Sequence, residues 1–301
     1  MDMPARDGVV VVLTALPLEY QAMRSHLEDV QREDHPSGTR FELGVLPDTP
    51  WQVALARTGA GNNSAAVITE RAHAMFKPEA LFFAGVAGSL KEDIQLGDVV
   101  VATKVYDYQG AKETGEGRFA RPAAWDASHW LEQAASAALC DERWMDRLPP
   151  EIRAQQASSR TPKVHYKPIA SGETVLAAAH GSTAHLLRTT YNDAAAVEME
   201  SAGVAKAAHI AGGLHTLIVR GISDMADDGK SAADASGSQQ LAAANAAAAV
   251  SAIIADLIPR DTGRTVDSIA AIARANEQPP PRDHIDFRGS TFYGPVIGKK
   301  E

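Results

Sequence analysis

The sequence has a single cysteine, Cys140, among its 301 residues. One cysteine cannot form a disulfide within the chain, and such usage favours a reducing compartment. Long hydrophobic runs are lacking as well. The apolar run Val9–Leu16 near the N-terminus is too short to cross a bilayer and lacks a small-residue cleavage site. We therefore expect a cytoplasmic protein with no membrane segment.

Positive charge is scarce. Lys and Arg number 29 against 38 Asp and Glu, which gives a net charge of −9. An acidic surface repels phosphate backbones, so nucleic acid and anionic membranes are poor candidates for partners. A small anionic ligand stays open, because a local basic pocket can override the net sign. The ten histidines show no metal-ligand spacing, and we expect neither a metal nor a cofactor.

Strand-like and helix-like segments alternate along most of the chain. A β-branched run at Val9–Leu13 leads to Pro17, which is well placed to open a helix. Further strands are expected at 40–46, 51–57, 80–83, 98–106, 163–170, 195–197 and 215–222, and further helices at 64–76, 130–139, 200–211 and 239–258. This alternation predicts an α/β fold with a mostly parallel, covered sheet.

The composition changes after residue 258, so we place a domain boundary near residue 260. Residues 1–260 are predicted to form one catalytic domain. Residues 261–283 include Pro279–Pro281 and are predicted to be a linker. Residues 284–301 form a short tail in which apolar residues alternate with polar residues or glycine.

Three acidic residues follow predicted strands, at the edge of the sheet where ligands gather in such folds. Asp224 ends the run Arg-Gly-Ile-Ser-Asp, Glu200 ends Val-Glu-Met-Glu, and Glu19 lies one turn beyond the first strand. Each has a plainer explanation by itself, as a helix cap or a solvated helix residue. We assign Glu198 to that plainer class and expect it to point away from Glu200. The three together favour a functional site.

These motifs resemble the purine nucleoside phosphorylase and nucleosidase superfamily, and more closely its hydrolytic branch, the methylthioadenosine/S-adenosylhomocysteine nucleosidases. The resemblance runs from Val9 to Ile258. It implies a three-layer α/β/α fold around a mixed, partly barrelled sheet. It also implies a homo-oligomer, a dimer or larger, in which a neighbour closes the pocket around the 5′ end of the substrate.

The resemblance implies a role for each matching residue. Asp224 would protonate the purine, Glu200 would hold the ribose hydroxyls, and Glu19 would activate the attacking water. Arg220 and Thr58 would hold the water, and Ser223 would orient the acid. Met199 would pack on the sugar, and Val175 and Leu176 would cover the base. Gly88 would belong to a Gly85–Gly88 turn at the pocket floor.

The chemistry requires such groups independently of the resemblance. An unprotonated purine leaves poorly, and a neutral carboxylic acid beside it typically contributes about 10²- to 10⁴-fold in rate. A carboxylate on the sugar hydroxyls gains strength as the sugar becomes cationic. A second carboxylate takes the proton of a water on the opposite face, as in inverting glycosidases. Phosphorolysis is the alternative, but it needs several arginines where the sequence offers only Arg220, and Glu19 would repel phosphate.

The substrate stays open in two respects. Val175 stands where many family members place an aromatic ring, which leaves the preference for adenine open. Lys112 and Lys230, each expected in a glycine-bearing loop, are candidates to hold a 5′-phosphate. AMP or ATP is therefore an alternative to methylthioadenosine as substrate. A nucleoside sensor without catalytic activity is a further alternative, which the presence of all three acidic residues disfavours.

The segment Ile285–Gly298 is similar to short glycine/aromatic C-terminal motifs of bacterial defence and cell-death effectors. Such motifs are thought to pair in amyloid-like fashion with a matching motif on a partner protein. Pro295 and the glycines weaken a strand, so an unpaired tail is the alternative. The effector interpretation predicts an enzyme that destroys a nucleoside or nucleotide pool after recruitment.

Overall fold

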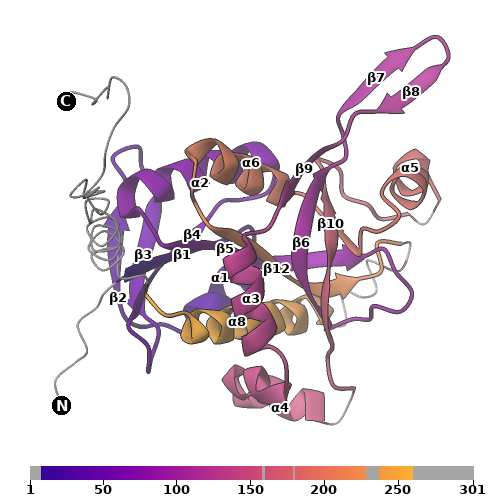
Figure 1. Ribbon diagram of the computed structural model, residues 1–301. Coiled ribbons are helices and arrows are strands. Elements are labelled where there is room, and N and C mark those ends of the chain that lie inside the picture. The colour runs from indigo at the N-terminus through magenta and orange to yellow at the C-terminus, as the bar shows by residue number, and fades with distance from the viewer. Residues whose placement is uncertain (1–7, 158–159, 179, 228, 230–236, 260–301) are drawn as a thin grey trace, which may run out of the picture. The chain divides into compact units, whose positions relative to one another are not determined.

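The computed structural model describes residues 8–157, 160–178, 180–227, 229 and 237–259 (Figure 1). The predicted linker (261–283) and tail (284–301) lie outside the described residues, as does Lys230. The division into a catalytic domain, linker and tail therefore stays a prediction.

All described strands except those of one separate hairpin (residues 111–114 and 117–120) form one mixed sheet. At its centre, β1 (Gly8–Thr14) pairs in parallel with β4 (Trp51–Arg57) and β5 (Ala80–Ser89), and β5 pairs in parallel with β12 (Thr216–Asp224). Two antiparallel strands extend one side, β3 (Arg40–Val45) and β2 (Glu28–Asp34). The other side continues through β6 (Val99–Asp107), β10 (Val164–Ser171) and β11 (Ala196–Glu198).

This second side curls into a barrel. Strand β11 reaches back to pair antiparallel with β5, so that β5, β12, β6, β10 and β11 close on themselves. A short outer strand, β9 (Ala123–Asp126), pairs with β6. The predicted mixed, partly barrelled sheet is confirmed.

Helices cover both faces of the sheet (Figure 1). One face carries α2 (Asn62–Phe76) and α6 (Ser201–Ala211), and the other carries α1 (Pro17–Arg24), α3 (His129–Ala138) and α8 (Ser238–Asp256). Successive side chains of a strand point to opposite faces. Accordingly, Val10 and Val12 enter the core beneath α8, while Val11 and Leu13 enter the core beneath α2 and α6. The predicted three-layer α/β/α fold is confirmed.

Several elements differ from the sequence-based expectation. The stretch 110–162, where only a helix at 130–139 was expected, also holds the hairpin β7 (Ala111–Thr114) and β8 (Gly117–Ala120), β9, the 3₁₀ helix η1 (Glu142–Arg147) and α4 (Pro150–Ala157). Strand β2 and helix α5 (Ser182–Thr190) were not expected either. The prediction of a turn at Gly85–Gly88 is wrong, because this stretch stays paired to β12 and ends against β11, so that β5 continues through it.

None of the helices in the described part of the chain combines the length and the apolarity needed to cross a membrane.

Candidate active site

A cavity of about 310 Å³ lies at the carboxyl ends of β1, β5, β11 and β12. It is the edge of the sheet at which parallel α/β folds bind their ligands. Eight of the predicted site residues line it together, and these are Glu19, Gly88, Val175, Leu176, Met199, Glu200, Ser223 and Asp224. The structure thus brings the three predicted acidic residues into one cavity.

Glu19 is fixed by backbone donors at the start of α1. Its Oε2 accepts from the N–H groups of Ala15 and Leu16, both at 2.8 Å, and its Oε1 accepts from Val86 N–H at 2.8 Å. The residue is only 3% exposed. Burial raises the pKa of the Glu19 carboxyl, although Arg220 and these N–H donors act to lower it. A carboxylate so placed takes up a proton more readily than an exposed one.

Glu200 and Glu198 flank the junction of β11 and α6. Glu200 Oε1 accepts from Gly61 N–H at 3.1 Å. Glu198 accepts from Ser201 N–H at 3.0 Å and from Ser201 Oγ at 2.9 Å, which serves the start of α6 as expected. The expectation that it points away from Glu200 is wrong. Glu198 pairs with Arg220 Nη2, which also lies 3.7 Å from Glu200 Oε2, because one buried guanidinium draws both carboxylates.

This crowding changes the acidity of Glu200. Burial raises its pKa to about 7, the neighbouring Glu198 carboxylate adds to the rise, and Arg220 and Gly61 N–H oppose it. A group with this pKa exchanges its proton near neutral pH. Glu200 is therefore poised to change its charge when a charged ligand arrives.

Arg220 lies behind the cavity rather than in its lining, with no exposed surface. Its guanidinium stacks over the Phe83 ring at 4.3 Å, and Nη2 donates to Ser201 Oγ at 3.1 Å. Nη1 and Nε make no hydrogen bond with the described part of the protein. A Cβ built on Gly85 would lie 1.9 Å from Nη1 and 2.7 Å from Glu19 Oε1. Glycine at this position lets the guanidinium and the Glu19 carboxyl lie directly against the backbone of β5.

Asp224 owes its position to an irregularity in β12. The register against β5 shifts between Ile222 and Asp224, a β-bulge that lets two consecutive side chains, Ser223 and Asp224, line the same cavity. Ser223 Oγ donates to Asp224 Oδ2 at 2.9 Å, and Ala226 N–H donates to Oδ1 at 2.9 Å. A Cβ on Gly88 would lie 2.6 Å from Asp224 Oδ1, so glycine there keeps the carboxyl accessible.

Three predicted site residues are not brought to the cavity wall. Thr58 Oγ1 donates to the carbonyls of Gly59 at 2.7 Å and Thr14 at 3.2 Å and does not line the cavity. Lys112 is exposed on β7, not in a loop as expected, since residues 111–114 pair with β8. Arg220 lies behind the cavity, where its guanidinium contacts Glu198 and Glu200, which line it.

Sequence reasoning missed the N-terminus of α2 as part of the site. Gly61 N–H holds Glu200, and Asn62 N–H donates to Glu173 Oε1 at 3.1 Å. Asn62 Oδ1 accepts from Ser171 Oγ at 3.0 Å and from Gly203 N–H at 2.8 Å, which ties α2 to β10 and α6. Asparagine at a helix start was the available signal. Gln239, in the first turn of α8, also lines the cavity.

The described wall of the cavity is rich in carboxyl groups. It includes the carboxyl groups of Glu19, Glu198, Glu200 and Asp224 and no lysine, arginine or histidine among the residues that the structure describes. Within the same residues, no cluster of three or more histidine, cysteine, aspartate or glutamate side chains has the arrangement of a metal site.

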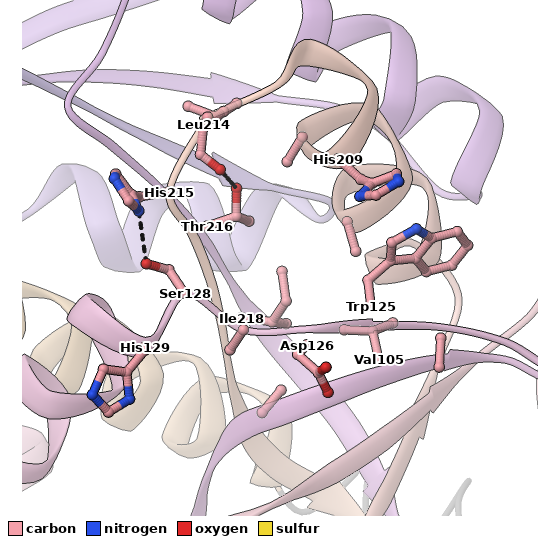
Figure 2. A pocket seen from close by; sticks show the side chains of 16 residues that line it. Val105, Trp125, Asp126, Ser128, His129, His209, Leu214, His215, Thr216 and Ile218 are labelled. Atoms are coloured by element: carbon pink, nitrogen blue, oxygen red, sulfur yellow. Dashed lines mark hydrogen bonds between the residues drawn. The ribbon is translucent and has the colours of Figure 1, made fainter. Parts of the chain in front are cut away.

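A second cavity, of about 650 Å³, lies at the opposite end of β12 (Figure 2). Its floor is apolar and includes Val105 and Ile218, with the Trp125 indole beside His209 at the rim. Across it, Ser128 Oγ and His215 Nδ1 lie 2.8 Å apart in a hydrogen bond. None of the three predicted acidic residues lines this cavity.

Comparison with known proteins agrees with the geometry. The chain is 28% identical to the ATP nucleosidase Cap17 of Escherichia coli over 241 residues, which cover 73% of this chain and 46% of that protein. It is 28% identical to a 5′-methylthioadenosine/S-adenosylhomocysteine nucleosidase of Maridesulfovibrio salexigens over 250 residues, which cover 82% of this chain and 98% of that enzyme. The chain thus spans about half the length of Cap17.

Solved structures show the same fold. The Neisseria meningitidis 5′-methylthioadenosine/S-adenosylhomocysteine nucleosidase, in complex with methylthio-immucillin-A, superposes with a TM-score of 0.68 at 25% identity and covers 83% of this chain and 100% of that one. A futalosine hydrolase of Helicobacter pylori superposes with a TM-score of 0.66 at 20% identity, covering 83% of this chain and 100% of that one, and so shares the fold. The sequence profile of the Phosphorylase superfamily matches residues 9–255. The chain therefore belongs to the Phosphorylase superfamily.

Proposed function

We propose that the protein hydrolyses the N-glycosidic bond of a purine nucleoside or nucleotide and releases the free base. The observation that carries this proposal is that Glu19, Glu200 and Asp224 line one cavity of about 310 Å³, within the size range of small-molecule sites. The relatives named as nucleosidases support it. No cofactor is required by this chemistry.

The reaction follows from the positions of the three groups. Asp224, in its acid form, gives its proton to a purine nitrogen, and the electron pair of the bond to the sugar carbon goes to the base as the bond breaks. Ser223 and Ala226 N–H orient the Asp224 carboxyl. Glu200 stabilises the cationic sugar through its hydroxyls, an electrostatic contribution that grows in the transition state.

The attacking water is proposed to bind in the cavity beside Glu19, which lines it and would accept a hydrogen bond from the water. Arg220 Nη1, which has no hydrogen-bond partner among the described residues, is proposed to help hold this water. The water adds to the sugar carbon as its proton passes to Glu19, whose raised pKa suits a base. The Arg220–Glu198 pair is proposed to hold the guanidinium in place.

The charge of the cavity supports water rather than phosphate as the nucleophile. Phosphorolysis requires cations around the phosphate, whereas the described wall carries four carboxyl groups and Arg220 is already paired with Glu198. A second anion at this position would be repelled.

The test is a substrate panel of adenosine, methylthioadenosine, AMP and ATP, incubated with and without inorganic phosphate, with free base followed by chromatography. Base release without phosphate is expected. Asp224→Asn should lower the rate by about 10²- to 10⁴-fold, while Asp227→Asn, outside the cavity lining, should leave it unchanged. Full turnover in Asp224→Asn would refute the assignment of the acid. Binding without base release would indicate a sensor.

A nucleotide substrate and a role in antiviral defence form the second candidate function. The similarity to the ATP nucleosidase Cap17 favours the nucleotide substrate, and Lys230 is proposed to meet the 5′-phosphates. We further propose a cytoplasmic homo-oligomer whose tail (284–301) recruits a partner protein. Base release faster from ATP or AMP than from methylthioadenosine would support the nucleotide. Deletion of the tail should abolish co-assembly while base release continues, and loss of both or of neither would contradict the role of the tail.

A further inference from the structure

The larger cavity at the amino end of β12 (Figure 2) takes no part in the proposed reaction. Its floor is made of buried side chains, and three of them are the alanines Ala102, Ala205 and Ala208. Val105 and Ile218 add larger apolar groups. Because methyl groups stand where longer side chains would fill the space, a volume of about 650 Å³ is left, within the size range of small-molecule sites.

Trp125 supplies the aromatic surface of this cavity. It lies on β9, where it pairs with Val105 of β6, and its indole is at the rim beside the His209 imidazole (Figure 2). Within the described residues, the indole stacks on no other ring and its N–H donates no hydrogen bond. A partly exposed indole with an unused ring and an unused donor is suited to a planar ligand that carries an acceptor.

The position of His215 in the wall is fixed by two contacts. Ser128 is the N-cap residue of α3, yet its side chain makes no capping bond to that helix. Its Oγ lies instead 2.8 Å from His215 Nδ1 (Figure 2). The His215 ring also meets the Trp130 ring edge to face, with the ring centroids 5.2 Å apart. A serine at this position ordinarily caps its helix, so its hydroxyl here serves the imidazole in place of the helix.

The polar groups of the wall can both donate and accept hydrogen bonds. A neutral imidazole has one donor and one acceptor nitrogen, and the wall contains the imidazoles of His129, His209 and His215. Among the described residues, no lysine or arginine lines the cavity. Asp126, which does, lies 3.4 Å from the Lys104 ammonium in an ion pair. A phosphate would find no cation in this wall, whereas an uncharged ring with donor and acceptor nitrogens would be matched.

We infer that this cavity binds a free purine base, a planar and uncharged heterocycle with both kinds of nitrogen. Trp125 stacks on the base, and the imidazoles of His209 and His215 form hydrogen bonds with its nitrogens. The choice of a purine among such heterocycles rests on the proposed function, because base release supplies this molecule. The two cavities have no lining residue in common in the described part of the chain, so a base bound here leaves the reaction site open.

Tryptophan fluorescence of the full chain, titrated with adenine, tests the inference. Among the residues that the structure describes, no tryptophan lines the smaller cavity, so a base stacked on Trp125 gives the signal. Saturable quenching is expected. His209→Leu keeps the indole as reporter but loses the hydrogen bonds, so it should raise the dissociation constant about tenfold, equivalent to about 1.4 kcal/mol.

Calorimetric titration with adenine gives a second measurement that needs no reporter. Trp125→Ala should remove one adenine site per chain, since stacking on an aromatic side chain contributes much of the affinity for a base. Phe119→Ala is the matched control, because Phe119 is 51% exposed on β8 and does not line the cavity, and it should change neither titration. Circular dichroism and thermal melting show whether each variant stays folded.

AMP separates a free base from a nucleotide as the ligand. Its phosphate has no cationic partner in the described wall, so AMP should bind about tenfold more weakly than adenine. Quenching insensitive to His209→Leu, an unchanged number of sites in Trp125→Ala, or AMP bound as tightly as adenine would overturn the inference. Adenine binding that depends on Trp125, in a chain that releases no base from any substrate, would refute the proposed function and support the inference. Base release without such binding would refute the inference alone.

Discussion

The two ends of β12 carry cavities of opposite character. At its carboxyl end, Asp224 belongs to a cavity of about 310 Å³ with four carboxyl groups in its wall. At its amino end, Thr216 belongs to a cavity of about 650 Å³ with an apolar floor and a rim of tryptophan and imidazole (Figure 2). The acid of the larger cavity, Asp126, has a side chain that is 80% exposed, whereas Glu19 and Asp224 are 3% and 2% exposed.

The cavity of the proposed active site differs from the other one in its buried carboxyl groups rather than in a larger volume. An exposed carboxyl such as Asp126 remains hydrated. A buried one costs free energy unless it is hydrogen-bonded, and at the smaller cavity backbone N–H groups supply those bonds. A fold retains such costly groups where they are used. Variants at the two ends of β12 test whether this difference between the cavities affects activity.

The largest effect is expected from Glu19→Gln. The amide keeps the shape of the side chain but cannot take a proton from water, so base release should fall by about 10²- to 10⁴-fold. Steady-state kinetics on the best substrate of the panel measures it. Asp126→Asn, the matched change at the other cavity, should retain the full rate. Equal losses in the two variants would remove the distinction between the cavities.

Glu200→Gln should separate activity from stability. The Glu200 carboxyl has a pKa of about 7 in the folded chain, against an ordinary value of 4.5 for the unfolded chain. As pH rises, it therefore ionises in the unfolded chain before it does so in the folded chain. Its contribution to stability is thus complete below pH 4.5 and lost as pH passes 7. Glutamine does not ionise, so the variant should be more stable at pH 8, by up to about 3 kcal/mol, and equal at pH 4.5.

Urea unfolding at both pH values measures this difference. A variant that is less stable than the unmodified chain at pH 8 would contradict the raised pKa of Glu200 in the folded chain. Base release by the same variant should fall, which would show that the group costing stability is the group used in the reaction.

The smallest effect on activity is expected at the cavity of Figure 2. Trp125→Ala removes the indole at the rim of this cavity. The cavity lies at the amino end of β12, whereas Asp224 lies at its carboxyl end. Because the two sites share no contacts, kcat/KM should change by less than about twofold. Initial rates at low substrate concentration, measured separately for the variant and the unmodified chain, give this ratio. A loss of tenfold or more without a change in melting temperature would couple the two ends of the strand.

Much of the fold could be predicted from local pattern. The β-branched run at Val9–Leu13 and the proline that follows correspond to β1 and α1, and the alanine-rich stretch corresponds to α8. Closure of the barrel was expected only from the family resemblance and could not be predicted from local pattern, because the pairing of Val197 with Gly88 joins short strands distant in sequence. The hairpin of β7 and β8 was not expected, since its residues are exposed and carry no hydrophobic alternation.

The residues of the candidate site also divide into those that could be predicted from the sequence and those that could not. Residues that follow strands, such as Glu200 and Asp224, could be found from their place in the pattern, and the structure brings them together. The partner of Glu198 could not, because Arg220 lies on a different strand and reaches it only after β11 and β12 are folded into one sheet. Thr58 failed as a lining residue for a local reason: its hydroxyl is taken by neighbouring carbonyls.

The bulge in β12 bears on how this chemistry can be transferred. On a regular strand, neighbouring side chains alternate between faces, so a Ser-Asp pair copied onto one would send the serine and the acid to opposite layers of the protein. Grafting the activity onto another scaffold therefore demands the irregular backbone at Ile222–Asp224 along with the side chains. Loss of a single residue there would turn the acid away without altering its identity.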